Sequence, residues 1–402
     1  MNDKFFGFIL AEEDYEKFVK THKELIDEVS KSFEKIYIIN VSYLKLRNNN
    51  YIIKNQHLLP KNFVCINMIS SIQFLRFFKN KKFVAIQYLS KNPDFFKIFF
   101  LIKLANIKNI MIMNLGNFGV GHTINFNPRY IFAFKHYYIK GFYRIFRILT
   151  ILNIFPKIDL LFESNSMIVN SINNGYIKKI EKKFPFLKLS YFQKIEKINS
   201  LFYDNFLIKK NLVVKNTSKT ILYVDVPIDH GDRTTREGPV NEKSKIFFYN
   251  NLNLFLTKLS KMFKMNVVIG VHPSSKDINH FFSNFDISKK RTMDLITGSE
   301  IIVVSHSSLI SMMAIYKKKI ISIRSKHMGK FHSDLSENYS NSLGLFKVNI
   351  DEDFDYNKEF ILDSLNNSIL NYDEHILKYI KSDGDNFSTK TIIKKIKENF
   401  FY

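Results

Sequence analysis

Short apolar runs alternate with longer amphipathic stretches along most of this chain. In the first half, runs typical of buried strands cover residues 5–10, 36–39, 63–66, 83–86, 110–113 and 158–163. Residues 12–33 instead place their apolar side chains on one side of a helix. Because strands separated by helical patterns form βαβ units, the first half predicts a parallel sheet with helices between its strands.

The pattern stops at residues 209–219, a polar and basic stretch that predicts a linker between two domains. After it, strands are expected at residues 220–225, 267–270, 301–304 and 320–323, and helices at 242–263, 292–297, 308–316, 359–370 and 389–400. The predicted fold class is therefore α/β, with an N-terminal Rossmann-like domain over residues 1–212 and a C-terminal domain over residues 213–402. The last helix is free to pack back on the first domain.

Length and composition agree with two packed domains. The chain has 402 residues, of which 46% are hydrophobic and 24% charged, values typical of a folded protein. Its single cysteine, Cys65, excludes an internal disulfide framework and fits a reducing, cytoplasmic compartment. No window reaches the roughly 18 apolar residues of a membrane span, and the first residues do not resemble a signal peptide.

The net charge of +23 has two interpretations. It can attract anionic lipid, nucleic acid or a phosphorylated substrate, or it can reflect a codon bias that favours Lys, Asn, Ile and Phe. Nucleic acid is not expected as a partner, because no zinc-ligand spacing, RNA-recognition signature or helix-turn-helix pattern is present. Residues 129–155 mix basic, aromatic and apolar positions. They predict either an amphipathic helix on an anionic membrane surface or a core helix with a solvated basic face.

Two polar motifs follow predicted strands of the second domain, at the ends where open α/β sheets bind ligands. His272, Pro273 and Ser274 end one strand, and an imidazole there can donate a hydrogen bond to a phosphate. Ser307 and Ser308 precede an apolar helix whose first N–H groups favour an anion. The plainer interpretations are a turn histidine and ordinary N-capping. We expect the pair to bind one phosphate from the ends of two successive strands of one sheet.

A loop rich in acids and arginine follows the first strand of the second domain. Asp229, Asp232 and Glu237 are candidates for a catalytic base that takes a proton from an attacking sugar hydroxyl. Arg233 can bind an acidic sugar or a phosphate. The alternative is a polar loop of Asx-turns without a catalytic role.

Residues 220–324 resemble the nucleotide-binding half of GT-B glycosyltransferases. More narrowly, they resemble bacterial sialyltransferases and related capsule or lipopolysaccharide transferases, which use CMP-activated acidic sugars. Those families carry a His-Pro motif and a Ser-Ser or Ser-Thr motif that bind the donor phosphate, matched here by His272-Pro273 and Ser307-Ser308. The resemblance implies a GT-B fold, with two Rossmann-like domains facing a cleft. The first domain, residues 1–212, is then expected to bind the acceptor, and the second, residues 213–402, the nucleotide sugar. It also implies an inverting, metal-independent transfer without a cofactor.

One departure concerns the base. The families have an acidic pair followed by glycine, whereas this chain has Asp229-His230-Gly231. Asp229 is the first choice for the base, with Asp232 and Glu237 behind it.

The resulting hypothesis is a glycosyltransferase that moves sialic acid or a related ulosonic acid from a CMP-activated donor to a surface polysaccharide or lipopolysaccharide. Its expected partners are a nucleotide sugar, a glycan or lipid-linked acceptor and an anionic membrane surface, so its expected location is cytoplasmic or peripheral on the inner face of the membrane. One alternative is a GT-B transferase that uses a UDP or GDP sugar or a polyol-phosphate donor. Another is an inactive, basic, membrane-associated glycan-binding protein.

Overall fold

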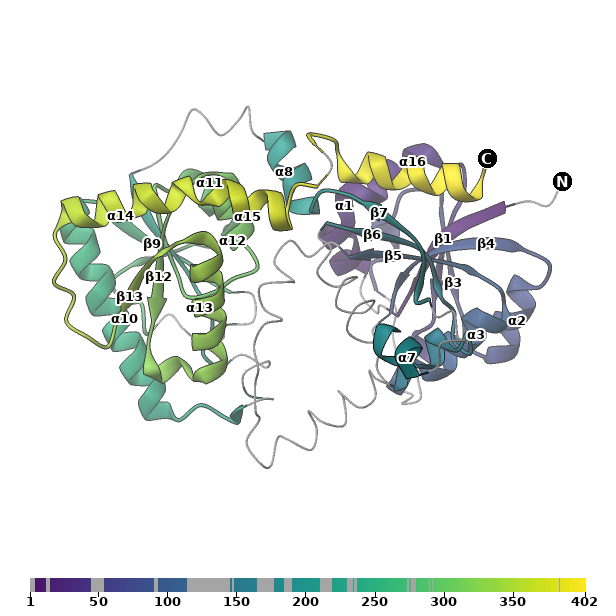
Figure 1. The fold of residues 1–402 in the computed structure, drawn as a ribbon, viewed down its shortest axis with the longest axis horizontal. Coiled ribbons are helices and arrows are strands. Elements are labelled where there is room, and N and C mark those ends of the chain that lie inside the picture. The colour runs from purple at the N-terminus through teal and green to yellow at the C-terminus, as the bar shows by residue number, and fades with distance from the viewer. Residues whose placement is uncertain are drawn as a thin grey trace. The chain divides into compact units, whose positions relative to one another are not determined.

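The computed structural model describes residues 4–11, 15–44, 54–89, 93–113, 145–146, 148–164, 177–183, 190–209, 219–229, 234, 237–272, 275, 280–288, 290, 292–382 and 384–402. These residues form two units (Figure 1). The first unit takes its residues from Met1–Asn114, Tyr137–Leu201 and Asp383–Tyr402, and the second takes them from Phe202–Ser382. Each unit is built on one parallel sheet.

The sheet of the first unit has the strand order β3-β2-β1-β4-β5-β6-β7. Its strands are β1 (Lys4–Leu10), β2 (Ile36–Asn40), β3 (Phe63–Asn67), β4 (Lys82–Tyr88), β5 (Lys108–Met113), β6 (Ile158–Glu163) and β7 (Phe192–Lys197). The helices of this unit are α1 (Tyr15–Ser32), α2 (Ser71–Phe78), α3 (Phe96–Leu104), α7 (Lys178–Lys183) and α16 (Ser388–Phe400), with short 3-10 helices η1 (Ser42–Leu44), η2 (Gln56–Leu58) and η3 (Pro93–Phe95).

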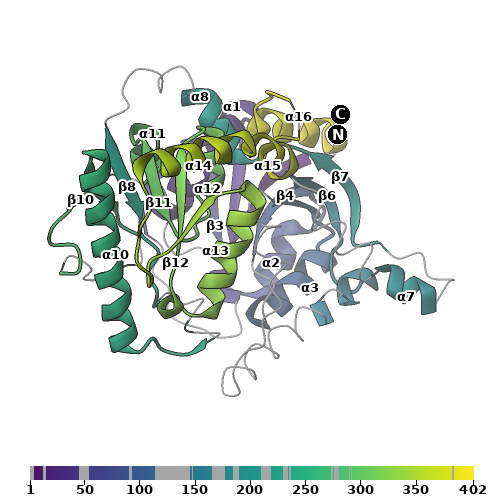
Figure 2. The ribbon, with the colours of Figure 1, turned by 60° about the vertical axis from the view of Figure 1, so that its left-hand side comes forward.

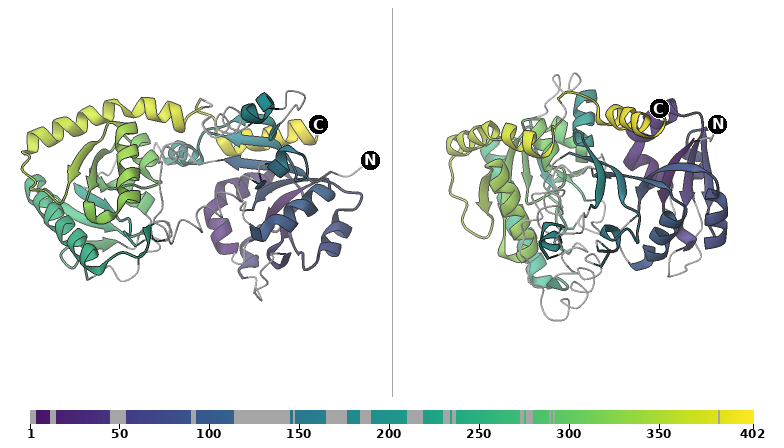
Figure 3. Two further views of the ribbon diagram at one scale, coloured as in Figure 1. Left: turned by 60° about the horizontal axis from the view of Figure 1, so that its bottom comes forward. Right: turned by 45° about the vertical axis from the view of Figure 1, so that its right-hand side comes forward.

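Helices cover both faces of this sheet. Alternate side chains of a strand point to opposite faces, so apolar side chains on both faces need such a cover. Phe8 of β1 lies in a buried cluster with side chains of α1 and α16. The next residue, Ile9, lies in a second cluster with side chains of α2 and α3. The views in Figures 2 and 3 show α16, the last helix of the chain, alongside α1 of the first unit.

The sheet of the second unit has the order β10-β9-β8-β11-β12-β13. Its strands are β8 (Thr220–Val224), β9 (Asn266–Gly270), β10 (Asp286–Ser288), β11 (Ile301–Val304), β12 (Lys319–Arg324) and β13 (Phe346–Asn349). Its helices are α8 (Leu201–Lys209), α10 (Glu242–Phe263), α11 (Thr292–Gly298), α12 (Ile310–Ile315), η6 (Lys326–Met328), α13 (Lys330–Leu343), α14 (Lys358–Leu370) and α15 (Tyr372–Tyr379). The order reverses between β8 and β11, which is the switch point of a doubly wound sheet.

Helix α10 shows why the amphipathic pattern at residues 242–263 predicted a helix correctly. The Asn241 side chain accepts a hydrogen bond from the Lys243 N–H at 2.8 Å and caps the first turn. Lys264 ends the helix in the left-handed conformation, with φ at 53°. Between these caps, aromatic and leucine side chains of one face are buried in the core of the second unit.

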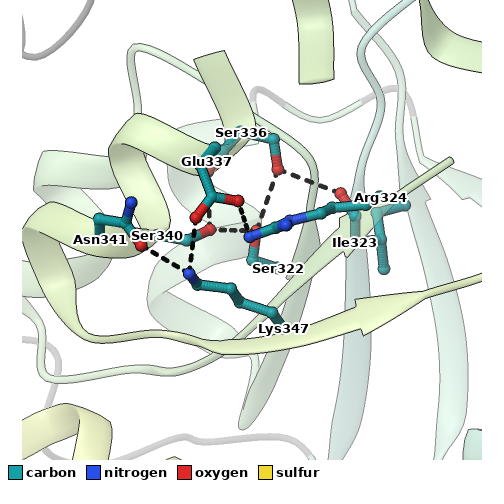
Figure 4. Close-up of polar contacts among 8 residues, drawn as sticks. All are labelled: Ser322, Ile323, Arg324, Ser336, Glu337, Ser340, Asn341 and Lys347. Carbon is teal, nitrogen blue, oxygen red and sulfur yellow. Dashed lines mark hydrogen bonds and ion pairs between the residues drawn. The ribbon is translucent and has the colours of Figure 1, made fainter. Parts of the chain in front are cut away.

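Helix α13 is held by polar contacts (Figure 4). Ser340 Oγ donates to Ser322 Oγ at 2.6 Å, and Ser336 Oγ lies 3.2 Å from the same oxygen. Glu337 forms ion pairs with Arg324 and with Lys347. These contacts tie the helix to β12 and β13, and they add to the burial of Phe331, Tyr339 and Leu343 on the same helix.

The strands expected from apolar runs are confirmed within one or two residues at each end. Several described elements were not predicted: the strands β7, β10 and β13, the helices α2, α3, α7, α8, α13 and α15, and the short 3-10 helices. Helix α12 begins at Ile310, two residues later than expected. Most of the linker expected at residues 209–219, and most of the helical stretch expected at 129–155, lie outside the described residues.

Candidate functional site

The candidate site lies at the carboxyl edge of the second sheet, beside its switch point. In the strand register, Val224 at the end of β8 pairs with Gly270 of β9 on one side and with Val304 of β11 on the other. The residues that follow these three positions therefore leave the sheet at the same edge. They include Asp225, His272 and Ser305.

Asp225 is the centre of a buried hydrogen-bond group. Its side chain is 1% exposed, and its Oδ2 accepts hydrogen bonds from the His272 backbone N–H at 3.2 Å and from Ser275 Oγ at 2.5 Å. The Ser275 N–H in turn donates to the His272 carbonyl at 2.9 Å. These contacts fix the turn that begins at His272 to the end of the neighbouring strand.

Burial raises the pKa of Asp225, and the nearby Asp229 carboxylate adds to this effect. The hydrogen bonds from Ser275 and His272 act in the opposite direction, because they stabilise the charged form. The second oxygen of Asp225, Oδ1, is buried and has no hydrogen-bond partner within the described part of the chain.

The two predicted phosphate motifs belong to strands that are not neighbours. His272 follows β9 and Ser307 and Ser308 follow β11, but β8 lies between those strands. The sequence predicted the ends of successive strands, but the unpredicted β10 lies between β9 and β11 along the chain, and the chain builds to both sides of β8. Two strand spacings separate the motifs, roughly 10 Å, which leaves room for a ligand between them.

Ser307 makes local hydrogen bonds of the kind that ordinary N-capping predicts. Its Oγ accepts a hydrogen bond from the Leu309 N–H at 3.1 Å, and its carbonyl accepts one from the Ile310 N–H at 3.1 Å. The serine therefore stabilises the turn that leads into α12. A hydroxyl that accepts in this way keeps its own O–H for donation to a ligand. Ser308 is exposed beside it.

The candidate acids have different surroundings. The Asp229 side chain is 48% exposed and lies 3.1 Å from Lys245 Nζ. Glu237 Oε1 accepts a hydrogen bond at 2.5 Å from the Phe331 N–H in the first turn of α13. Glu237 is therefore engaged in holding a helix end. Asp232 and Arg233, like Pro273 and Ser274, lie outside the described residues.

The structure adds two histidines that the sequence did not single out. His306 follows the end of β11, and His332 is buried in the first turn of α13. Their ring centroids are 4.4 Å apart. Their proximity depends on the position of α13, whose Phe331 N–H also donates to Glu237. No pattern along the chain indicated this position.

The described residues contain no group of three or more His, Cys, Asp or Glu side chains arranged to hold a metal ion. Of the helices that the structure describes, none is long and apolar enough to cross a membrane.

No protein-family model matches the sequence, and no curated protein matches it. Solved structures do match over nearly the whole chain. The wall teichoic acid polymerase TagF, in an H444N form soaked with CDPG, is 14% identical, with a TM-score of 0.51 over 100% of this chain and 90% of the polymerase chain. The UDP-GlcNAc 2-epimerase of Methanocaldococcus jannaschii, in complex with UDP-GlcNAc and UDP, is 14% identical, with a TM-score of 0.50 over 99% of this chain and 100% of the epimerase.

The chain has the GT-B fold. Both matched proteins share it, and the two parallel sheets observed here agree with it. The predicted fold class is confirmed. At this level of identity the likeness to TagF and to the epimerase shows the fold alone.

Proposed function

We propose that the protein is a glycosyltransferase that uses a nucleotide-activated donor bound at the carboxyl edge of the second sheet. The observation that carries this proposal is the buried Asp225 carboxylate, which holds the His272 turn beside the switch point. Open α/β sheets bind nucleotides at such points. A side chain fixed there serves a ligand better than one on an unsupported loop.

The phosphate of the donor would lie between the two motifs. The His272 imidazole on one side and the hydroxyls of Ser307 and Ser308 on the other supply donors without a bound metal. Arg233, Pro273 and Ser274 are proposed to complete the binding set. No cofactor takes part in this proposal, because these groups meet the charge of the phosphate.

Asp229 is the proposed base. Its carboxylate is half exposed, and Lys245 holds it from one side. It can accept the proton of an acceptor hydroxyl while the hydroxyl oxygen attacks the donor sugar and the nucleotide leaves with the bonding electron pair. Asp232 is the second candidate for the base. Glu237 is weaker because the Phe331 N–H already occupies one of its oxygens.

For the donor, we propose a CMP-activated acidic sugar, and for the acceptor a surface glycan. The His-Pro and Ser-Ser motifs support this choice. A second candidate is a polyol-phosphate transferase with a CDP-linked donor. The likeness to TagF, whose structure was soaked with CDPG, favours that candidate. The two candidates share a cytidine nucleotide and differ in the group transferred.

We also propose that the protein attaches peripherally to an anionic membrane through an apolar face of the first unit. The face is formed by the exposed side chains Phe100, Leu104, Ile145, Ile148, Leu152 and Ile154. Phe100 and Leu104 lie one turn apart on α3, as do Ile148 and Leu152 on the segment that follows residue 147.

The two segments of the apolar face are packed together. The ring centroids of Phe99 and Phe146 are 4.4 Å apart, and Lys103 Nζ donates to Asn153 Oδ1 at 2.7 Å. Lys97 is exposed one turn before Phe100. An exposed apolar patch beside cations fits the boundary between anionic headgroups and acyl chains.

The experiment that tests the proposed function is a thermal-shift comparison of CMP, CDP, UDP and GDP. A ligand that binds only the native state raises the melting temperature. Cytidine nucleotides are expected to stabilise the protein most.

A further inference from the structure

The amino edge of the first sheet carries a lysine at the start of six of its seven strands. Each of these lysines is the first residue of its strand or lies within two residues before it. They form a lysine row, named here in the order of the strands from β3 to β6: Lys61, Lys35, Lys4, Lys82, Lys108 and Lys157. Lys157 is partly exposed, and the other five are exposed.

The centre of the lysine row places like charges side by side. Lys4 and Lys82 are partners in the register of β1 and β4, and like charges directly opposite each other destabilise a sheet. Lys108 is in register with Val84, two residues after Lys82, so its side chain leaves the same face of the sheet. Lys108 pairs with Asp159 at 3.4 Å, whereas neither Lys4 nor Lys82 forms an ion pair with a carboxylate of the described residues. A bound anion would relieve this repulsion.

Two cations at the same edge are held over aromatic rings. Lys35 Nζ lies 5.3 Å from the centroid of the Tyr37 ring. Lys81 Nζ lies 3.7 Å from the centroid of Phe77 and 5.6 Å from that of Phe5. Burial lowers the pKa of Lys81, and the charge of Lys35 lowers it further, so these two ammonium groups also repel each other. The rings fix the positions of cations that no carboxylate balances.

A codon bias towards lysine does not explain this placement. At the carboxyl edge of the same sheet, the last residues of the strands include one lysine, Lys197, and it pairs with Glu163. At the amino edge of the second sheet, acids accompany the lysines: Asp286 begins β10, and Glu300, directly before β11, lies 3.6 Å from Lys319 of β12. The unbalanced positive charge is therefore a feature of this edge and not of strand ends in general.

We infer that the lysine row binds a linear anionic polymer, an acidic glycan with a carboxylate on each sugar. Neighbouring strands lie about 4.8 Å apart, so the six strand ends extend over roughly 24 Å in one line. Such a line suits a chain of regularly spaced charges better than the two-dimensional array of headgroups in a bilayer. Single-stranded nucleic acid fits less well, because Lys35 and Lys81 cover faces of the rings on which its bases would stack.

This inference rests on the proposed transfer of an acidic sugar, whose polymeric product would carry the carboxylates. It adds a second surface, at the opposite edge of the first sheet from the ends of its strands, where the product is held by charge alone. Binding to it should therefore weaken steeply as salt is added.

Fluorescence anisotropy with a labelled polymer of N-acetylneuraminic acid, measured at several salt concentrations, tests the lysine row. The wild type is expected to bind the polymer most tightly at low salt. Replacing both Lys4→Gln and Lys82→Gln should weaken binding at low salt about tenfold or more. It should also reduce the slope of log affinity against log salt by roughly 1–2, because fewer counterions are released. Both side chains are exposed, so the double variant is expected to fold.

The matched control is the double variant Lys258→Gln and Lys261→Gln. Both lysines are exposed on α10 of the second unit, so the net charge changes equally while the lysine row stays intact. This variant should bind the polymer like the wild type. Equal losses in the two double variants would show that net charge alone attracts the polymer and would overturn the inference.

Two other results would also overturn it. One is no binding of the polymer to the wild type. The other is a row variant that keeps glycan binding but loses binding to single-stranded DNA or to phosphatidylserine-containing vesicles. Stabilisation by nucleotides, measured on the same samples, tests the proposed function separately, because the row variant should retain it.

Discussion

The Asp225 carboxylate accepts a hydrogen bond from the His272 backbone N–H across 3.2 Å, and it accepts another from Ser275 Oγ. A residue at the end of β8 thereby sets the conformation of the turn after β9. The acid is buried, so it can do this only because its partners offset the loss of water. The phosphate-binding role proposed for His272 depends on this contact.

Replacing Asp225 by alanine should lower the free energy of unfolding by about 2–3 kcal/mol, because hydrogen bonds to a buried carboxylate are lost and their donors are left unpaired. The same variant should bind nucleotide more weakly, since the His272 turn loses its anchor. Urea unfolding and thermal shift measure the two effects. Asp229→Asn is the control for stability: its surface ion pair with Lys245 is worth less than about 1 kcal/mol. An Asp225→Ala variant as stable as Asp229→Asn would contradict the anchoring role.

Lys318 should be more important for stability than its neighbour Lys319. Lys318 is buried and donates to the carbonyls of Thr297 and Ser299, at 2.8 and 2.7 Å, at the end of α11. Burial lowers the pKa of Lys318. Lys318→Ala leaves both carbonyls without this donor and should cost about 2–3 kcal/mol in urea unfolding.

Lys319→Ala removes only an ion pair of 3.6 Å with Glu300, so it should cost less than about 1 kcal/mol. Equal losses for the two lysine variants would show that the carbonyl contacts of Lys318 do not stabilise the fold.

Acid should destabilise the second unit through His375. Burial lowers the pKa of His375 from 6.5 to about 4, while its Nδ1 lies 2.8 Å from Ser342 Oγ. In the unfolded chain the ring takes up a proton below about pH 6.5, whereas the folded chain resists it until about pH 4. The stability from this residue is therefore complete above pH 6.5 and declines as the pH falls toward 4, by about 3 kcal/mol in all.

His375→Gln should make the free energy of unfolding less dependent on pH between 7 and 5. His22 of the first unit, whose pKa burial also lowers to about 4, adds a loss of the same sign, so some pH dependence remains. Urea unfolding at the two pH values measures the difference. An unchanged pH dependence in His375→Gln would rule out this histidine as a source.

The apolar face should bind anionic vesicles. Glutamate at Ile148 and Leu152 places charge on that face and should weaken sedimentation with phosphatidylserine-containing vesicles about tenfold or more. Leu254→Glu on α10 is the control, because Leu254 is also apolar and exposed but lies in the second unit. Binding that all variants retain, or that the wild type lacks, would contradict the peripheral attachment.

The sequence predicted strands best where both faces of the sheet are covered by helices. Strands such as β8 and β11 are covered on both faces, so they appear as continuous apolar runs. The edge strand β7 was missed because most of its side chains are polar and exposed. Helix α13 was missed because its contacts with β12 use Ser336 and Ser340 where most helices use aliphatic side chains.

The site could be predicted only in outline. Strand ends place His272 and Ser307 at one sheet edge, and the structure agrees. The role of Asp225 as an anchor of His272 could not be predicted. Its hydrogen bond with His272 joins residues 47 positions apart and depends on the order of the strands in the sheet. Its only signal was an acid at the end of an apolar run. The contact between Glu237 and Phe331 could not be foreseen for the same reason: it joins a loop to the unpredicted α13.

The most direct test of the proposed donor site compares the melting temperature of the wild type and of His272→Ala with CMP, CDP, UDP and GDP. A nucleotide at 100 times its Kd stabilises the native state by about 2.7 kcal/mol, which gives a clear shift. We predict that a cytidine nucleotide raises the melting temperature of the wild type and raises that of His272→Ala much less. No shift with any of the four, or equal shifts in both proteins, would contradict the account.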